Sequence, residues 1–354
     1  MRVALDTNHR FILQGGVSRY IEHLLHGFSA LRAPAFEWFE LNWPVTNYEY
    51  RQPIRAFKTF YREMIWGRFI GPRRLAASGA DLLHSLDFPI LTRIPCRHVL
   101  TLHDLGYIRT PDRFRRWTRL RARARLVRCH EADKVICISQ FTADEAIKLI
   151  GLSAARIEVV HLGPGFADPE FSAATQAPDL PLPPEFFLFV GHLDPNKNLS
   201  LLREIYELAA REQTPLPPLV IAGKRWEGVS REGPPPDNWI FLGRQPDAVL
   251  RHLFAHAIAN VFPSRYEGFG MTVLEAMSCG CPVICSPLAS IPEIAGDAAL
   301  FVKPDAGEYL CALRSVMDDP ALRGELREKG RQRAAQFSWR KCAAQTLDVY
   351  RHLV

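Results

Sequence analysis

The chain has 354 residues and a mass of 40.2 kDa, which at about 100–200 residues per domain predicts two domains. Hydrophobic residues make up 47% and charged residues 23%, so the composition is that of a globular protein rather than a disordered or fibrous one. No apolar run reaches the roughly 18 residues that a membrane-spanning helix needs, and Asp6 interrupts the first apolar stretch too early for a secretory leader. We therefore expect neither an integral membrane protein nor a secreted one.

The distribution of charge and the cysteine content indicate the type of binding partner and the cellular compartment. Residues 1–168 carry 25 Lys and Arg against 16 Asp and Glu, whereas the remaining residues carry 19 against 22. A basic first half indicates an anionic partner there. The eight cysteines form neither a CxxC pair nor a zinc-finger spacing, so we expect reduced, mostly buried thiols in a cytoplasmic protein.

Short apolar strings alternate with amphipathic stretches along the first half of the chain. Residues 17–28 have helical spacing, and Thr142 followed by Glu145 resembles a capping box at the start of a helix that ends near Leu149. Alternating strands and helices predict a mostly parallel, doubly wound sheet. The predicted strands of this half are residues 2–6, 36–41, 81–84, 98–102, 134–138 and 158–161.

The alternation stops at a Pro- and Ala-rich stretch and then begins again. We predict an N-terminal domain over residues 1–167, a linker over 168–184 and a C-terminal domain over 185–337. A last helix over 338–354, capped by Ser338, is expected to pack back on the first domain. The fold class is therefore α/β, with two Rossmann-like domains facing each other across a cleft. The predicted strands of the second half are residues 186–190, 219–222, 239–242, 260–262, 282–285 and 300–302.

The clearest local pattern is PSRYEGFGMTVLEAMSCGCPVICS, residues 263–286. Gly268 and Gly270 allow a ligand close to the backbone, and the helix that follows presents free N–H groups to an anion. Glu267 lies at the carboxyl end of a strand, where open α/β sheets bind ligands. Glu275 follows about one turn inside the helix, where a carboxylate can accept two hydrogen bonds from a ribose diol. The alternative is that Glu275 is a half-buried surface glutamate and Glu267 a charge at the start of the helix.

A second turn, GHLDPNKNLSLL (191–202), also follows a predicted strand. Lys197 stands where this turn enters a helix, a position from which it can meet a phosphate, although a single lysine there is often only solvated. The string IAGK (221–224) ends another strand with Gly223, a third place where backbone can approach a ligand.

Together these motifs resemble the retaining glycosyltransferases of family 4, also called group 1, which have the GT-B fold. The spacing of Glu267 and Glu275 resembles the family's E-x7-E signature, and VGHLDPNKNL (190–199) is similar to its VGRLxxxKNL. Four further segments resemble family motifs in the same order. They are GGVSRYIEHL (15–24), LHDL (102–105), ICISQFTADEAI (136–147) and VVHLGPG (159–165).

The resemblance implies roles for the matching residues of the second domain. Glu275 would bind the ribose of a nucleotide-sugar donor, Glu267 would face the donor sugar, and Lys197 would neutralise the diphosphate leaving group. Where the family has an arginine, this chain has His192. Either His192 covers the phosphate in a partly protonated form or Lys224 or Arg225 replaces the arginine. The donor-sugar hydroxyls would meet the backbone of Gly268, Phe269, Gly270 and Met271.

For the first domain the resemblance implies that His103 lies near the donor sugar, and that Gly15 and Gly16 lie near the phosphates. The predicted catalytic residues are thus Glu267, His103 and Lys197. The implied mechanism retains the anomeric configuration, with a phosphate oxygen taking the acceptor's proton. The sequence contains no Asp-x-Asp cluster suited to Mg²⁺, so we expect a metal-independent enzyme without a cofactor.

Residues 109–128, from Arg109 to Arg128, hold nine arginines and one acid. Drawn as a helix, Trp117, Leu120, Ala124 and Val127 share an apolar face that is expected to pack inward. The arginines then form either a solvated face or a contact with an anionic membrane surface or a lipid-linked diphosphate. Residues 57–74 mix aromatic and basic side chains and are a second candidate for membrane contact.

The resemblance does not define the substrates. GDP-mannose is the first choice of donor, because the HDL and ISQFTADEA segments are similar to those of bacterial polysaccharide mannosyltransferases; UDP-sugars are the alternative. A glycan or lipid-linked glycan is the expected acceptor, and the expected location is the cytoplasm or the inner face of its membrane. Another GT-B activity, epimerase or phosphorylase, is a second hypothesis. Nucleic-acid binding ranks lower, since no helix-turn-helix, RNP or zinc pattern is present.

Overall fold

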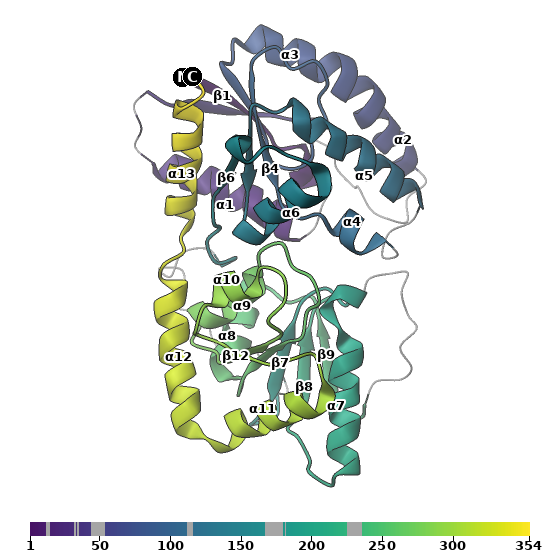
Figure 1. The fold of residues 1–354 in the computed structure, drawn as a ribbon, viewed down its shortest axis with the longest axis vertical. Coiled ribbons are helices and arrows are strands. Elements are labelled where there is room, and N and C mark those ends of the chain that lie inside the picture. The colour runs from purple at the N-terminus through teal and green to yellow at the C-terminus, as the bar shows by residue number, and fades with distance from the viewer. Residues whose placement is uncertain are drawn as a thin grey trace. The chain divides into compact units, whose positions relative to one another are not determined.

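The computed structural model describes residues 1–11, 15–31, 33, 35–43, 54–111, 116–166, 180, 182–224 and 236–354. The chain divides into two compact units (Figure 1). The N-terminal unit comprises Met1–Gly163 and Ser338–Val354, and the C-terminal unit comprises Pro164–Phe337. Most of the predicted linker lies outside the described residues.

The N-terminal unit is built on a parallel sheet of six strands. In spatial order the strands are β2 (Glu37–Leu41), β1 (Arg2–Asp6), β3 (Leu82–Ser85), β4 (Arg97–Leu102), β5 (Lys134–Cys137) and β6 (Ile157–Val159). From β1 the chain goes first to β2 on one side and then to β3 on the other. The strand order therefore reverses between β1 and β3, and such a switch point is where open α/β sheets bind ligands.

Helices and short helical turns cover this sheet, and the last helix of the chain is one of them. Helix α13 (Trp339–Arg351) begins at Ser338, whose Oγ accepts the N–H of Lys341 at 3.1 Å, and it packs along α1 (Gly16–Ala30) (Figure 1). A Cβ on Gly27 would lie 2.9 Å from the Cβ of Ala343, so only a glycine allows this close approach of the two helices. The other helices are α2 (Ile54–Phe60), a π-helical stretch (Tyr61–Ile70), α3 (Gly71–Ser78), α4 (Gly106–Arg109), α5 (Arg116–Arg128) and α6 (Gln140–Ile150).

The C-terminal unit also has a parallel sheet of six strands. Their spatial order is β12 (Leu300–Phe301), β11 (Val283–Cys285), β10 (Asn260–Phe262), β7 (Phe187–Val190), β8 (Leu219–Ala222) and β9 (Trp239–Gly243). Counted from β7, this is the Rossmann order, with its switch point between β7 and β10. The helices are α7 (Leu199–Arg211), α8 (Asp247–His256), α9 (Met271–Ser278), α10 (Ile291–Ala295), α11 (Ala306–Asp318) and α12 (Pro320–Ala334).

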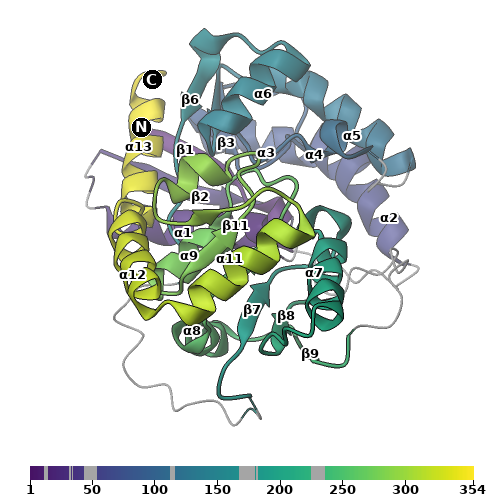
Figure 2. The same cartoon turned by 60° about the horizontal axis from the view of Figure 1, so that its bottom comes forward.

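The core of the C-terminal unit explains why its strands are continuously apolar. Alternate residues of β7, Phe187 and Phe189, pack with Ile205 of α7 and Leu313 of α11 on one face of the sheet. Helices α7 and α11 lie side by side there (Figure 2), and α9 packs against α12. Because helices cover both faces of this sheet, neither face of a strand is exposed to solvent, and apolar residues do not alternate with polar ones along it. Continuous apolar runs are the pattern expected of buried parallel strands.

The predicted α/β class with two Rossmann-like sheets is confirmed, and every predicted strand is present to within one or two residues at each end. The predicted capping box is wrong. Helix α6 is capped by Ser139, whose Oγ accepts the N–H of Thr142 at 3.1 Å. Ser139 stands three residues before Thr142, which is the usual spacing from a cap to the N–H it accepts, and Glu145 instead pairs with Arg109.

The predicted inward face of α5 is also wrong. Ala124 and Val127 are exposed, whereas Leu126 and Cys129 join the core beside β4 and β5. The side chains of Trp117 and Leu120 lie outside the described part of the chain. The helix is rotated because the sheet, rather than the widest apolar stripe of the isolated helix, decides which side chains are buried.

Three buried histidines of the N-terminal unit are held neutral. His84 contacts the Tyr350 hydroxyl through Nδ1 at 2.6 Å and Thr101 Oγ1 through Nε2 at 2.8 Å, and its burial lowers its pKa well below 6.5. Burial lowers the pKa of His98, whose Nε2 lies 3.0 Å from Ser85 Oγ, to about 4, although Asp133 acts in the opposite direction. Burial likewise lowers the pKa of His9 to about 4.

We therefore predict that acid destabilises this unit and that His98→Gln reduces the effect. Between pH 6.5 and 4 the unfolded chain takes up a proton at His98 that the folded chain does not, so stability is lost as pH falls through this window. At pH 5 this single histidine costs about 2 kcal/mol. Glutamine keeps a donor for Ser85 but does not titrate. Thermal unfolding at pH 7.5 and 5 should show a smaller loss in the variant, and an equal loss would contradict the assignment.

Candidate active site

The switch point of the C-terminal sheet gathers most of the predicted site residues. Strands β7 and β10 are neighbours there, with Leu188 opposite Asn260. The residues that follow them, 191–198 and 263–270, therefore emerge at the same edge of the sheet. The two loops are joined directly, because the N–H of Arg265 donates to the carbonyl of Asn196 at 2.7 Å.

The loop after β7 is built to present Lys197. The buried Asp194 carboxylate accepts the N–H of Asn196 at 2.9 Å and starts a single 3-10 turn, Pro195–Lys197. Asn198 then adopts a left-handed conformation, φ 57°, at the N-cap position of α7, without a side-chain hydrogen bond to the first turn. Gly223 at the end of β8 packs under this loop, where a Cβ would lie 1.8 Å from the carbonyl oxygen of Gly191. No residue with a side chain fits at this point.

Lys197 and Glu267 form an ion pair across the two loops. Nζ lies 2.6 Å from Glu267 Oε1, and the side chains are 15% and 17% exposed. Nζ also lies 4.8 Å from the centroid of the Phe262 ring, within cation–π range. Ser290 Oγ donates to the backbone carbonyl of Glu267 at 3.0 Å, which holds the far side of the loop. The result is a partly desolvated cation whose position is defined by the Glu267 carboxylate and the Phe262 ring.

Helix α9 begins beside this pair with an open N-terminus. Its cap, Gly270, has φ 94° and provides no side-chain hydrogen bond to the first turn. A helix N-terminus of this kind presents backbone donors and a partial positive charge. Phe269 is buried against Phe337 at a ring distance of 6.1 Å and anchors the loop, while Gly268 and Met271 are partly exposed.

Glu275 lies one turn inside α9 and is 3% exposed. It is therefore not a surface glutamate, the alternative that the sequence left open. A carboxylate costs free energy to bury unless hydrogen bonds accompany it.

The residues considered for phosphate contact beside Lys197 are less constrained. The side chain of His192 is exposed, and its carbonyl accepts the N–H of Asp194 at 2.9 Å. Lys224 is also exposed and accepts the N–H of Leu193 through its carbonyl at 3.1 Å. Arg225 lies outside the described residues.

The N-terminal unit holds the remaining predicted residues. Gly15, with φ 148°, precedes α1, which begins at Gly16, and no atom lies within 4 Å of a Cβ placed on Gly16. His103 follows β4 and packs edge-on against Tyr20 of α1 at a ring distance of 4.8 Å. Its Nε2 lies 2.9 Å from the carbonyl oxygen of Leu86. A carbonyl can only accept, so Nε2 is the donor in this hydrogen bond, and Nδ1 is the ring nitrogen that remains for another contact.

A buried polar group at the switch point of the N-terminal sheet was missed by the sequence reasoning. Asp6 at the end of β1 accepts from Asn8 Nδ2 at 2.6 Å, and His9 Nε2 lies 3.4 Å from Asp87 Oδ2. Burial raises the pKa of Asp6 to about 6, with the hydrogen bonds from Asn8 acting in the opposite direction. The signal that could have found it is the string DTNHR (6–10), which begins at the last residue of a buried strand and holds four polar residues and one cation.

The described residues contain no cluster of three or more histidine, cysteine, aspartate or glutamate side chains placed to hold a metal ion. Nor does any helix in this part of the chain have the length and apolar character to cross a membrane.

Comparison with known proteins agrees with the fold described above, in which each of two units is built on a Rossmann-like parallel sheet. Residues 14–163 match the family model described as "Glycosyltransferase Family 4", and residues 171–333 match "Glycosyl transferases group 1". The chain is 33% identical to the O-antigen chain mannosyltransferase B of Escherichia coli, over 81% of this chain and 79% of that protein. The chain therefore belongs to glycosyltransferase family 4.

Solved structures share the fold over the whole chain. Sucrose-phosphate synthase from Thermosynechococcus elongatus superposes with a TM-score of 0.71 at 21% identity, covering 100% of this chain and 99% of that one. HepE of Anabaena, crystallised with UDP-glucose, gives a TM-score of 0.70 at 17% identity, covering all of both chains.

Two glycines of the predicted site should respond differently to alanine. Gly270→Ala forces a side chain into φ 94° and places its Cβ 2.5 Å from Ile291 Cδ1, so it should lower the free energy of unfolding by about 2 kcal/mol. Gly16→Ala meets open space and should change stability by no more than about 0.5 kcal/mol. Urea denaturation of both variants measures this, and equal losses would contradict it.

Proposed function

We propose that this enzyme transfers mannose, with retention, from GDP-mannose to a glycan or lipid-linked glycan in cell-surface polysaccharide biosynthesis. The observation that carries the proposal is the ion-paired Lys197 beside the open N-terminus of α9, one turn before the buried Glu275. This arrangement offers positive charge for a diphosphate and a carboxylate for a ribose. The mannosyltransferase of E. coli supports the choice of sugar, and the UDP-glucose complex of HepE supports a nucleotide sugar as donor.

In the proposed reaction, negative charge develops on the departing diphosphate and positive charge on the sugar ring. Lys197 and the N-terminus of α9 stabilise the first, since groups already fixed in a partly desolvated site cost no reorganisation. Glu267 holds Lys197 in place and faces the donor sugar, whose hydroxyls contact the backbone of Gly268, Phe269, Gly270 and Met271. Glu275 binds the ribose hydroxyls.

Retention requires the acceptor to attack from the face that the diphosphate leaves. We propose that a phosphate oxygen takes the acceptor's proton, so that no protein base is needed. Lys197 and the helix dipole then provide the charge neutralisation that a divalent cation provides elsewhere, and the enzyme is independent of metal. His192 covers the phosphates together with Lys197. In the N-terminal unit, Gly15 and Gly16 contact the phosphates, and His103 contacts the donor sugar through Nδ1.

For the acceptor side we propose contact with the inner face of the cytoplasmic membrane. Three aromatic side chains of α2 and the π-helical stretch that follows it, Phe57, Phe60 and Phe69, are 66%, 56% and 53% exposed. The exposed cations Arg68 and Arg73 accompany them. Exposed aromatics with adjacent cations are typical of segments that lie in a membrane interface, and each cation adds about 1 kcal/mol of attraction to anionic lipid.

Thermal shifts with nucleotides test the donor site. GDP at about 100 times its dissociation constant should stabilise the wild type by about 2.7 kcal/mol, and UDP and ADP should do so less. Glu275→Gln should remove most of the GDP shift because the amide does not accept both ribose hydrogen bonds. Glu308→Gln, an exposed glutamate of the same unit, is the control and should keep it. A folded wild type that no nucleotide stabilises would contradict the proposed donor site. A larger shift with UDP than with GDP would show that the donor carries uridine instead of guanosine.

Transfer assays test the mechanism. Lys197→Gln should lower kcat by about 10²–10³, the usual loss when one preorganised charge-stabilising group is removed, whereas the exposed Lys303→Gln should leave it unchanged. Excess EDTA should not alter the rate, and NMR of the product should show the anomeric configuration of the donor. An inverted product, or a rate that EDTA abolishes and Mg²⁺ restores, would contradict the proposed chemistry.

A further inference from the structure

The arginines between 109 and 128 do not form one solvated face. Arg109 pairs with Glu145, and Arg125 pairs with Glu63, which Arg62 also contacts at 2.5 Å. Burial would raise the pKa of Glu63, but the guanidinium groups of Arg125 and Arg62 lower it to about 2. These arginines are therefore part of the structure of the unit, and a separate explanation is needed only for those on the other side of α5.

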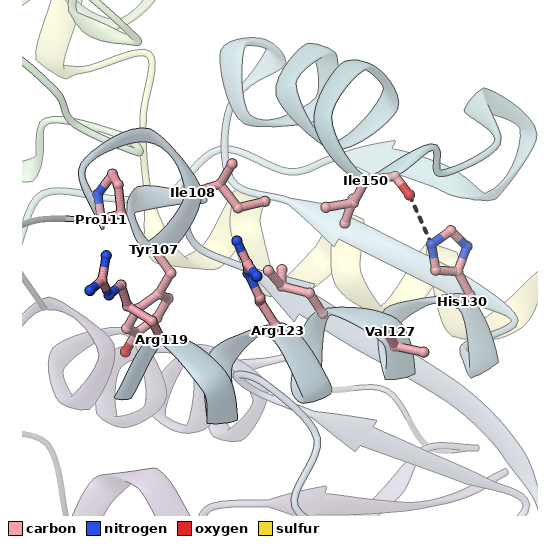
Figure 3. Close-up of a pocket in the computed structure, with 9 residues that line it drawn as sticks. Tyr107, Ile108, Pro111, Arg119, Arg123, Val127, His130 and Ile150 are labelled. Atoms are coloured by element: carbon pink, nitrogen blue, oxygen red, sulfur yellow. Dashed lines mark hydrogen bonds between the residues drawn. The ribbon is translucent and has the colours of Figure 1, made fainter. Parts of the chain in front are cut away.

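That other side of α5 lines a groove of about 670 Å³ within the N-terminal unit (Figure 3). Helix α4 and the turn after it form the opposite wall, and the end of α6 closes one end. His130 Nε2 lies 2.9 Å from the carbonyl oxygen of Ile150, which links the end of α5 to the end of α6. The lining residues are Tyr107, Ile108, Pro111, Arg119, Arg123, Leu126, Val127, His130 and Ile150.

The groove combines an apolar surface with two cations. Val127 is 67% exposed, and the apolar side chains of Ile108 and Ile150 also line the groove. Arg119 and Arg123 stand one helical turn apart and extend from α5 toward the segment that carries Ile108 and Pro111 (Figure 3). Within the described part of the chain, neither forms an ion pair with a carboxylate. A hollow of this size and composition suits one molecule that is both anionic and aliphatic.

We propose that this groove binds an alkyl diphosphate, the lipid end of a lipid-linked acceptor. The assignment rests on the proposed function and chooses the lipid-linked glycan of the two acceptors named there. The two guanidinium groups, one turn apart, bind the two phosphates, and the apolar side chains of Ile108, Val127 and Ile150, which come from three different helices around the groove, cover the first carbons of the chain. A phospholipid of the membrane offers a single phosphate and two chains, and it would need a flat surface rather than a bounded groove with paired cations.

Isothermal titration with farnesyl diphosphate tests the groove. The wild type should bind it at least tenfold more tightly than inorganic pyrophosphate or farnesol, since only the diphosphate lipid engages both cations and the apolar side chains of the groove. The double variant Arg119→Gln/Arg123→Gln should weaken binding at least tenfold, and so should Val127→Asp, which places a like charge beside the diphosphate. Arg340→Gln, an exposed arginine outside the groove, is the matched control and should bind as the wild type does.

The titration is repeated in Lys197→Gln, so that a diphosphate bound at the candidate donor site is not mistaken for one in the groove; unchanged affinity there supports the groove. Equal affinity for pyrophosphate, or undiminished binding by the double variant, overturns the proposal. Binding only to phosphatidylglycerol vesicles also overturns it, in favour of a membrane-facing surface. The GDP thermal shift of each variant checks folding and separates the two proposals: a retained GDP shift without farnesyl diphosphate binding overturns the groove alone, and the reverse overturns the donor site alone.

Discussion

The ion pair between Lys197 and Glu267 joins the two loops on which the C-terminal unit's chemistry depends. Its partners follow β7 and β10, the neighbouring strands at which the Rossmann order reverses. Loops at such a point diverge to opposite sides of the sheet and leave space between them. The ion pair places a cation on one side of this space, and the N-terminus of α9 lies on the other side. Because Gly223 has no side chain, the loop after β7 packs directly against the end of β8 at Gly191, and this close packing lets it reach the loop after β10.

The N-terminal sheet uses its own switch point differently. Its loops fill the space with buried polar side chains, Asp6, Asn8, His9 and Asp87, and burial keeps His9 neutral. In the C-terminal unit the equivalent position holds charged groups that are partly exposed. One topology thus gives two environments, because the loops rather than the strands determine how much water reaches the strand ends.

Helix α5 shows how a run of like charges is divided among different tasks. One side carries Arg125 into an ion pair with Glu63, where the loss of hydration is offset by a second guanidinium group. The other side places Arg119 and Arg123 beside apolar side chains in a groove. The sequence shows only the total charge, and the division follows from the rotation of the helix against the sheet.

The sequence by itself determined the α/β class, the strands, the cap at Ser338 and the glycine-rich loop before α9, because these depend on local patterns and on residues close in the chain. It also pointed to Glu267, Glu275 and Lys197 through their positions after predicted strands. Only the tertiary structure decided that Lys197 meets Glu267, 70 residues away, and that α5 turns Val127 outward. These outcomes depend on which strands are neighbours and on which side chains the sheet buries. Contacts between distant residues set both, and periodicity along the chain does not encode them.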